Sequence, residues 1–241
     1  MTTPRLHYPE GLAEGASVRL EGPRAHYLAH VLRLRPGARL WLFNDEDGEW
    51  AATLAALGRQ SATLELGRQV RAAAAETGPV LHFVPFRRNR LDWLVEKAVE
   101  LGVARLVPIL TERTVVKLEN PARLRAIAVE AAEQCGRLTV PELADAVPFG
   151  NWLAARDRSR KLLFADEGGG APIAAALAEA GLPDLLTGPE GGFTERERTL
   201  LLRADGITGV TLGSRILRAE TAALAVLAVW QAICRLSTES P

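Results

Sequence analysis

The sequence has little cysteine, few aromatic residues, no excess of charge of either sign and no long apolar run. Its two cysteines, Cys135 and Cys234, lie far apart, and neither has a cysteine or histidine at the spacing of a metal site. We therefore expect two reduced cysteines in the core and no metal centre.

The charges balance, with 29 basic residues against 29 acidic ones, and 48% of the residues are hydrophobic. This composition predicts a globular protein and excludes both a disordered chain and a polyelectrolyte, so any nucleic-acid site must be a local patch. The N-terminus leads into no signal-like segment, and the most apolar stretch, 222–230, is much shorter than the ~20 residues of a membrane span. We expect a cytoplasmic protein without membrane contact.

A low-complexity stretch, 71–79, ends in a Gly-Pro breaker and predicts a domain boundary, with domains at 1–72 and 73–241. The first domain alternates short β-like runs with turn-forming residues, and one helix at 24–32 interrupts them. This pattern indicates a small β-barrel. The expected strands lie at 17–20, 38–43, 50–57 and 62–66.

After residue 79 the pattern changes to strands that alternate with helices, which predicts an α/β fold with a mostly parallel sheet and helices on both faces. The clearest pairs of strand and helix are 162–165 with 173–180, 184–187 with 195–204, and 209–212 with 216–236. A further helix should begin after Asn120 and end before Gly136. The last helix is apolar on nearly every side, which predicts burial all round, in its own domain or in a homodimer.

Two loops of the second domain follow apolar strands and enter helices, the position where α/β sheets bind ligands. The loop 187–193 has three glycines in five positions, so its backbone can approach a ligand closely, and 194–197 fits a capping box. The second loop, 212–221, also passes a glycine and opens a helix with polar residues. If their strands are neighbours, the two loops form one cleft. Neither loop matches the dinucleotide or P-loop fingerprint.

These loops resemble the SPOUT superfamily and, within it, the bacterial 16S ribosomal RNA uracil-N3 methyltransferase family. The motifs that carry the resemblance are GPEGGFTERE at 188–197, LGSRILRAETA at 212–222, LVEKAVELGV at 94–103, PILTERTVVK at 108–117, EAAEQCGR at 130–137 and HYLAHVLR at 26–33. The motifs of the second domain span most of 80–225 in the family's order, and 26–33 is similar to the family's RNA-binding domain. Ala219 departs from the threonine expected there, which puts one hydrogen bond in doubt.

The resemblance implies a trefoil knot in the second domain, a PUA-like β-barrel as the first, a homodimer, and S-adenosylmethionine as the cofactor. The implied reaction is methylation of N3 of a 16S ribosomal RNA uridine, with the small ribosomal subunit as the expected setting. The cofactor-binding residues that match the family are Thr187, Gly188, Pro189, Glu190, Gly191, Gly192, Leu212, Gly213, Ile216, Leu217, Arg218 and Thr221.

The reaction requires uracil N3 to lose its proton and attack the donor methyl in line, so alignment of the two is the main demand. Arg218 is our candidate for stabilising the charge that develops on the uracil oxygens. Glu190 or Glu220 is the candidate base. The alternative, which we favour, is that each carboxylate is structural and caps backbone N–H groups.

A local basic patch lies near the N-terminus, where arginines and histidines far outnumber acids between residues 19 and 39. It predicts RNA contact, against the alternative of an ordinary solvated face. Further basic residues of the second domain extend the candidate set. The RNA-binding candidates are Arg19, Arg24, His26, His30, Arg33, Arg35, Arg87, Arg88, Arg113 and Arg137.

Two other functions stay open at this point. One is a knotted methyltransferase that acts on another RNA position, a ribose 2′-hydroxyl or guanine N1, because the same fold serves several acceptors. The other is an RNA-binding protein that keeps the fold without the chemistry. The sequence does not indicate the target uridine, the base, or whether naked RNA or an assembled subunit is the substrate.

Overall fold

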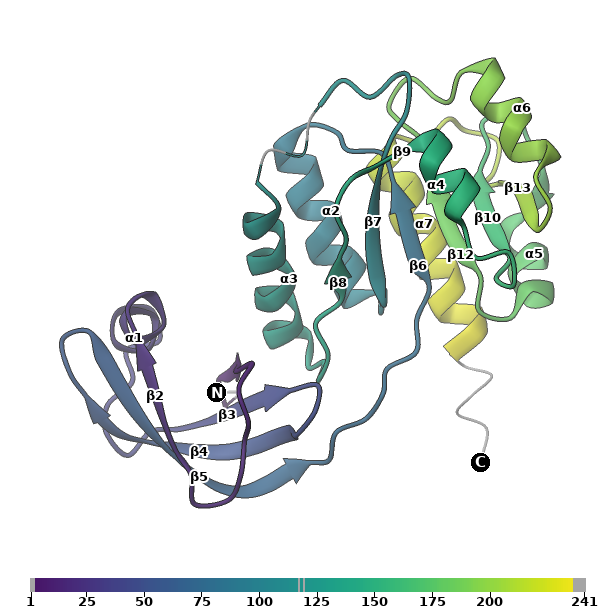
Figure 1. Ribbon diagram of the computed structural model, residues 1–241. Helices are drawn as coiled ribbons and strands as arrows, with labels where there is room; N and C mark the ends of the chain where they lie inside the picture. The colour runs from purple at the N-terminus through teal and green to yellow at the C-terminus, as the bar shows by residue number, and fades with distance from the viewer. Residues whose placement is uncertain (1–2, 117, 119, 236–241) are drawn as a thin grey trace. The chain divides into compact units, whose positions relative to one another are not determined.

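The computed structural model describes residues 3–116, 118 and 120–235. The chain forms two units (Figure 1). The first runs to Glu76 and also takes in Ala132–Val140, and the second comprises Thr77–Ala131 and the chain from Pro141 onward. The expected division at residue 72 assigned 132–140 to the second domain, so this segment differs from it.

The first unit is a curled sheet whose described strands follow the order β1-β3-β4-β5-β2. Neighbouring strands are antiparallel except for β1 and β3, which are parallel. The strands are β1 Arg5–His7, β2 Ser17–Glu21, β3 Arg39–Asn44, β4 Gly48–Leu57 and β5 Ser61–Arg71. Four of these were expected, whereas β1 was missed because three residues are too few to show a periodic pattern.

Alternating apolar residues build the core of this sheet. Val18 and Leu20 on β2 are buried between exposed neighbours, and Leu64 and Leu66 on β5 follow the same period of two. The expected helix at 24–32 is present as α1 Pro23–His26 followed by a turn of π-helix, η1 Tyr27–Val31. It closes over the core with Ala25 and Leu28 buried.

Arg5 explains why Ala132–Val140 belongs to the first unit. Its guanidinium donates to the carbonyls of Ala132, Glu133 and Arg137 at 2.7 to 3.0 Å and pairs with the buried carboxylate of Glu49 at 2.6 Å. These carbonyls lie at and just beyond the C-terminal end of a helix, where cations are favoured.

The second unit is built on a parallel sheet of eight strands within the described residues, in the order β11-β13-β10-β12-β6-β7-β8, with β9 paired to β7. The strands are β6 Val80–Phe83, β7 Arg105–Leu110, β8 Glu142–Leu143, β9 Val147–Pro148, β10 Leu162–Ala165, β11 Ala171–Pro172, β12 Asp184–Thr187 and β13 Ile207–Thr211. The expected parallel α/β architecture is confirmed.

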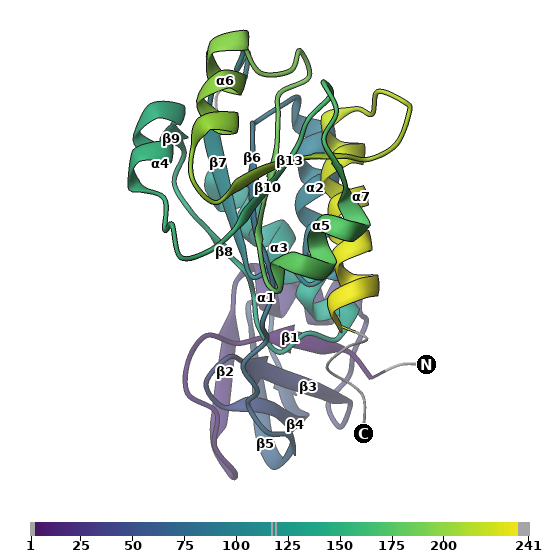
Figure 2. The same cartoon turned by 90° about the vertical axis from the view of Figure 1, so that its right-hand side faces the viewer.

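Helices cover both faces of this sheet, as Figure 2 shows, with α4 and α6 on one side and α2, α5 and α7 on the other. Phe149, Trp152 and Leu201 pack with Leu162 and Phe164 of β10 to form the core under α4 and α6. The helices are α2 Arg88–Glu100, α3 Pro121–Cys135, α4 Phe149–Ala155, α5 Ile173–Ala180, α6 Glu195–Arg203 and α7 Ala219–Trp230, followed by a π-helical turn, η2 Gln231–Arg235.

Two of these helices differ from the expectation. The last helix begins at Ala219, three residues later than expected, because Arg218 has an extended backbone. Within this chain it is exposed at Thr221 and Ala228, so of the two predicted forms of burial only that in a homodimer stays open. Helix α4 was missed because Pro148 and Gly150 favour a loop; Pro148 instead precedes the helix as its N-cap.

Cys135 contradicts the expectation of a core cysteine, since it is a free, exposed thiol at the end of α3. The side chain of Cys234 lies outside the described residues. Within the described residues, no helix is both long and apolar enough to span a membrane, and no group of three His, Cys, Asp or Glu side chains is placed to hold a metal ion.

Candidate functional site

A cleft opens at the carboxyl ends of three strands in the second unit. The loops that follow β12 and β13 line it, as the sequence predicts, but their strands are not neighbours. Strand β10 lies between them and adds a third loop. The cleft is lined by Ala165, Asp166, Glu167, Gly188, Pro189, Glu190, Gly192, Phe193, Arg198, Val210, Thr211, Leu212, Gly213, Ser214, Arg215, Ile216, Leu217, Ala219 and Ala222.

The glycine-rich loop after β12 ends in a capped helix and contains a position that requires glycine. Thr194 caps α6 by accepting the backbone N–H of Glu197, whose carboxylate accepts the backbone N–H of Thr194, so the expected capping box is present. Gly192 has φ +70°, and a Cβ there would lie 2.3 Å from a carboxylate oxygen of Glu167. This position therefore requires glycine.

The loop after β13 presents apolar side chains to the cleft. Ile216 is 85% exposed and Leu217 is partly buried, although the sequence predicted both to lie inside the last helix. Because α7 begins only at Ala219, these residues stay in the loop and face the cleft. An exposed isoleucine in a hollow is a suitable contact for an apolar or aromatic ligand surface.

Eight of the twelve residues proposed for the cofactor line this cleft: Gly188, Pro189, Glu190, Gly192, Leu212, Gly213, Ile216 and Leu217. Gly191, Arg218 and Thr221 lie outside its lining, and all three are exposed. Thr187 is buried at the end of β12, and its hydroxyl has no hydrogen-bond partner within the described residues. A buried hydroxyl without a partner is costly, so it is a candidate for a ligand contact.

The two candidate carboxylates share one cation. Arg90, on α2, lies 3.2 Å from Glu190 and 3.4 Å from Glu220, so it connects the glycine-rich loop to the first turn of α7. Glu220 is buried, whereas Glu190 is partly exposed at the cleft. Both carboxylates were expected to cap backbone N–H groups, but the observed partner of both is Arg90. Arg218 caps α7 with its backbone, and its guanidinium has no bonded partner among the described residues.

The third loop was missed, although the sequence carries a signal for it. Two acids and three glycines, Asp166–Gly170, follow the expected strand 162–165, which is the position of the other two loops. Asp166 is buried and makes a two-pronged ion pair with Arg198 of α6, with N···O distances of 2.9 to 3.1 Å. The hydrogen bond to Asp166 raises the pKa of Arg198 above its usual value.

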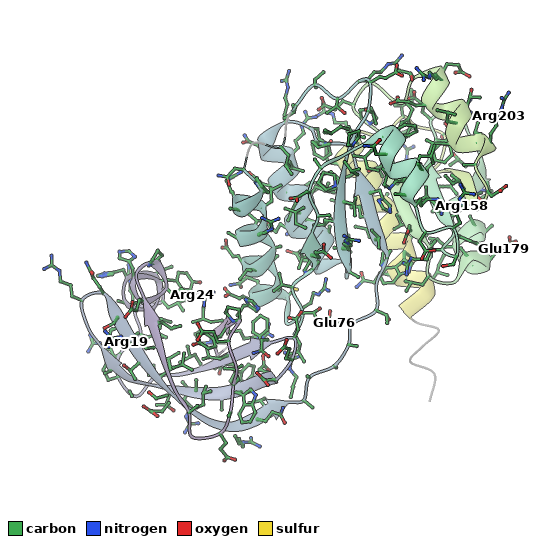
Figure 3. All side chains as sticks on the ribbon, in the orientation of Figure 1. Arg19, Arg24, Glu76, Arg158, Glu179 and Arg203 are labelled. Atoms are coloured by element: carbon green, nitrogen blue, oxygen red, sulfur yellow. The ribbon has the colours of Figure 1, made fainter. Side chains whose placement is uncertain are left out.

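The RNA-binding candidates of the first unit are exposed side chains on β2, α1, η1 and the loop after it. Figure 3 labels Arg19 on β2 and Arg24 on α1. The rings of His26 and His30 lie 4.4 Å apart, and Arg33 has the left-handed φ of +54°, which is uncommon for a residue other than glycine. The remaining members, His26, His30, Arg33 and Arg35, are exposed as well.

The candidates of the second domain fall into different environments. Arg87 is exposed, and the side chain of Arg88 lies outside the described residues. Arg113 donates to the carbonyl of Gly191 at 2.5 Å, so it supports the glycine-rich loop. Arg137 is buried in the first unit and pairs with Glu76 at 2.8 Å. Because its charge is already neutralised and enclosed, Arg137 is not part of an RNA surface.

Residues 78–231 match the family described as RNA methyltransferase domain, and residues 20–67 match the RNA methyltransferase PUA domain. The chain belongs to this family of RNA methyltransferases. It is 30% identical over 230 residues to ribosomal RNA small subunit methyltransferase E of Rickettsia conorii, covering 93% of each chain. It is 34% identical over 228 residues to the Synechocystis protein of the same name, covering 91% of this chain and 74% of that one.

The fold is also similar to solved members of the family. A crystal structure of ribosomal RNA small subunit methyltransferase E from Neisseria gonorrhoeae, bound to S-adenosyl methionine, matches with a TM-score of 0.88 and 31% identity, over 96% of this chain and 98% of that one. A methyltransferase from Legionella pneumophila in complex with the same cofactor matches with a TM-score of 0.85 and 27% identity, over 96% and 98%. The family resemblance drawn from the motifs is confirmed.

Proposed function

We propose that this methyltransferase transfers the methyl group of S-adenosylmethionine to N3 of a specific uridine in 16S ribosomal RNA. The observation that carries the proposal is the cleft itself, where the two motif loops and the loop after β10 meet at the carboxyl edge of a parallel sheet. Membership of the family of small-subunit ribosomal RNA methyltransferases supports the substrate. The trefoil knot implied by the motifs stays a prediction.

The residues of the cleft suit the donor. Leu212, Ile216 and Leu217 offer an apolar wall for an adenine ring, while the glycine-rich loop leaves backbone groups accessible for its polar edge. The unpartnered hydroxyl of Thr187 lies at the base of the same loop. When bound, S-adenosylmethionine supplies an electrophilic methyl group, and the task of the chain is to align it with uracil N3.

Arg218 is proposed to stabilise the uracil as N3 loses its proton, because its guanidinium is exposed beside the cleft loop and carries donors that suit the uracil oxygens. Of the two candidate bases, Glu190 is preferred. It lines the cleft, and Arg90 engages one of its oxygens, Oε1, whereas Glu220 is buried. Glu220 is then a structural carboxylate that holds Arg90.

For RNA, we assign the basic candidates on β2, α1, η1 and the loop after it as the contact surface of the first unit, and Arg87 as a separate contact on the second unit. The first-unit residues are Arg19, Arg24, His26, His30, Arg33 and Arg35. The apolar side chains of α2 and of the cleft loop, Trp93 at 45% and Ile216 at 85% exposed, support a homodimer as the working form. The small ribosomal subunit, assembled in the bacterial cytoplasm, is the proposed partner.

The decisive experiment is mass mapping of 16S ribosomal RNA from a strain that lacks this protein. Loss of one base-methylated uridine, restored by the wild-type gene, supports the proposal. Loss of a ribose methyl or a guanine methyl instead assigns a sister activity. An unchanged methylation pattern, with RNA binding retained in vitro, identifies a binding protein without the chemistry.

The RNA surface has its own test in vitro. Arg33→Glu should weaken RNA binding and reduce the slope of log affinity against log salt by roughly one, as expected when a phosphate contact is removed. The matched control is Arg68→Glu, the same charge change at an exposed position of β5. Equal effects of the two variants would assign the loss to net charge and not to this surface.

A further inference from the structure

The loop after β10 is held rigidly against the cleft. Asp166 is anchored on three sides, because its carboxylate is paired with Arg198, its backbone N–H donates to Val210 at 3.0 Å, and its Oδ1 accepts the N–H of Gly168 at 3.0 Å. A Cβ at Gly168 would lie 2.5 Å from the guanidinium of Arg198. The guanidinium therefore packs directly on the backbone, which leaves the loop little freedom.

Glu167 follows the anchored aspartate and lines the same cleft. Its carboxylate lies against Gly192 of the glycine-rich loop, since a Cβ on Gly192 would meet its Oε1 at 2.3 Å. Asp166 and Glu190, the other acids that line the cleft, pair with Arg198 and Arg90. Within the described residues, Glu167 makes no hydrogen bond or ion pair, so both of its oxygens are available to a ligand.

We propose that Glu167 accepts hydrogen bonds from the ribose hydroxyls of the methyl donor, and that Arg198 is a positioning residue that acts through Asp166. This inference rests on the proposed function. A carboxylate has two acceptor oxygens and no donor, which matches the two donors of a vicinal diol. Acidic side chains beside glycine-rich loops hold ribose hydroxyls in the same way in other α/β nucleotide sites.

The test is calorimetric binding of S-adenosylmethionine and of methylthioadenosine, which keeps the ribose but lacks the amino-acid end. Glu167→Gln should weaken both ligands by the same factor, about tenfold, as for a lost hydrogen bond to a charged acceptor. The matched control is Glu179→Gln, an exposed acid on α5 (Figure 3), which should bind as wild type does.

Each other outcome is decisive. A loss confined to S-adenosylmethionine would overturn the ribose assignment and place Glu167 at the donor's ammonium or sulfonium. Unchanged affinity for both ligands, with a folded variant by circular dichroism, would remove Glu167 from the site while the proposed function stands. If the wild-type protein binds neither ligand, the proposed function is refuted, and the ribose assignment that rests on it is refuted as well.

The positioning role of Arg198 is tested by a double-mutant cycle. Arg198→Lys keeps the charge but loses the two-pronged contact with Asp166, so it should weaken donor binding in the wild-type background. In the Glu167→Gln background the same change should have little further effect, because the group it positions is already lost. Equal losses in both backgrounds would show that Arg198 is merely structural.

Discussion

Two polar sites in the second unit contain the same kinds of residues but differ in their exposure to solvent. At the cleft, Asp166 and Glu190 pair with arginines, whereas Glu167 and Arg218 are exposed. Inside the sheet, Asp184 at the start of β12 pairs with Arg160 at 2.7 Å and lies 3.6 Å from His82, and all but Arg160 are buried.

The buried site is closed by Trp152, whose indole N–H donates to Nδ1 of His82 at 3.1 Å. Nδ1 must therefore be the acceptor, which makes His82 neutral with its proton on Nε2, facing Asp184. Burial lowers the pKa of His82, and the nearby Asp184 only partly opposes it. Burial acts to raise the pKa of Asp184, but His82 and Arg160 outweigh it, so the pKa lies below its usual value.

The open site should therefore control the affinity for the methyl donor, and the buried site should control the free energy of unfolding. Substitutions at the buried cluster should therefore change the free energy of unfolding with little effect on donor affinity, and those in the cleft should do the reverse.

The largest effect is expected for Asp184→Ala, which leaves Arg160 and His82 without their shared carboxylate inside the protein. Breaking such a buried pair costs about 3–5 kcal/mol of unfolding free energy, measured by urea denaturation. Asp145→Ala is the control, since that aspartate is 96% exposed in its pair with Arg125 and should change stability by less than about 1 kcal/mol. Equal losses of unfolding free energy in the two variants would show that the buried cluster contributes no more to stability than an exposed pair does.

Gly192→Ala should act on the open site. The new Cβ would displace the carboxylate of Glu167, the proposed ribose contact, so donor affinity should fall about tenfold, as for a lost hydrogen bond to a charged acceptor. Gly150→Ala is the control, because Gly150 lies in α4, does not line the cleft, and a Cβ there would meet no atom within 4 Å. Calorimetry with S-adenosylmethionine measures the donor affinity of both variants. A larger loss in the control than in Gly192→Ala would contradict the assigned loop geometry.

The pH dependence of stability should come partly from His82. Its folded-state pKa lies below the ordinary value of 6.5, so its contribution is complete above pH 6.5 and is lost as the pH falls below that value. The slope is at most about 1.4 kcal/mol per pH unit for one proton. Urea denaturation between pH 7.5 and 5.5 should show a shallower slope for His82→Gln than for wild type. His7, whose pKa is also lowered by burial, is present in both proteins and cancels.

The smallest effect is expected for Trp152→Phe, which keeps most of the ring packing and removes the indole donor. The lost hydrogen bond should cost about 1 kcal/mol of unfolding free energy. Without a donor on Nδ1, His82 can take a second proton more easily, so its folded-state pKa should lie closer to 6.5 and the variant should lose less stability on acidification than wild type does. Unchanged stability and an unchanged pH profile would show that the tautomer is not set by Trp152.

Local patterns predicted the elements well where they were long or strongly marked. Strands 162–165 and 184–187 and helix 173–180 have the expected bounds, because apolar runs end there at Gly, Pro or Asp. Short strands such as β8 and β11 were missed, since two residues carry no period. The start of α7 was misplaced because Ile216 and Leu217 fit a helical pattern, although they serve the cleft.

The sequence by itself determined the α/β class, the family and the two glycine-bearing loops, because strands, turns and glycine requirements are local properties of the chain. The tertiary structure alone decided that β10 lies between β12 and β13, which brings Glu167 into the cleft. It also decided that Arg90 joins Glu190 to Glu220 and that Arg137 is buried. Those contacts join distant residues, and no local pattern indicates the strand order or the packing that brings them together.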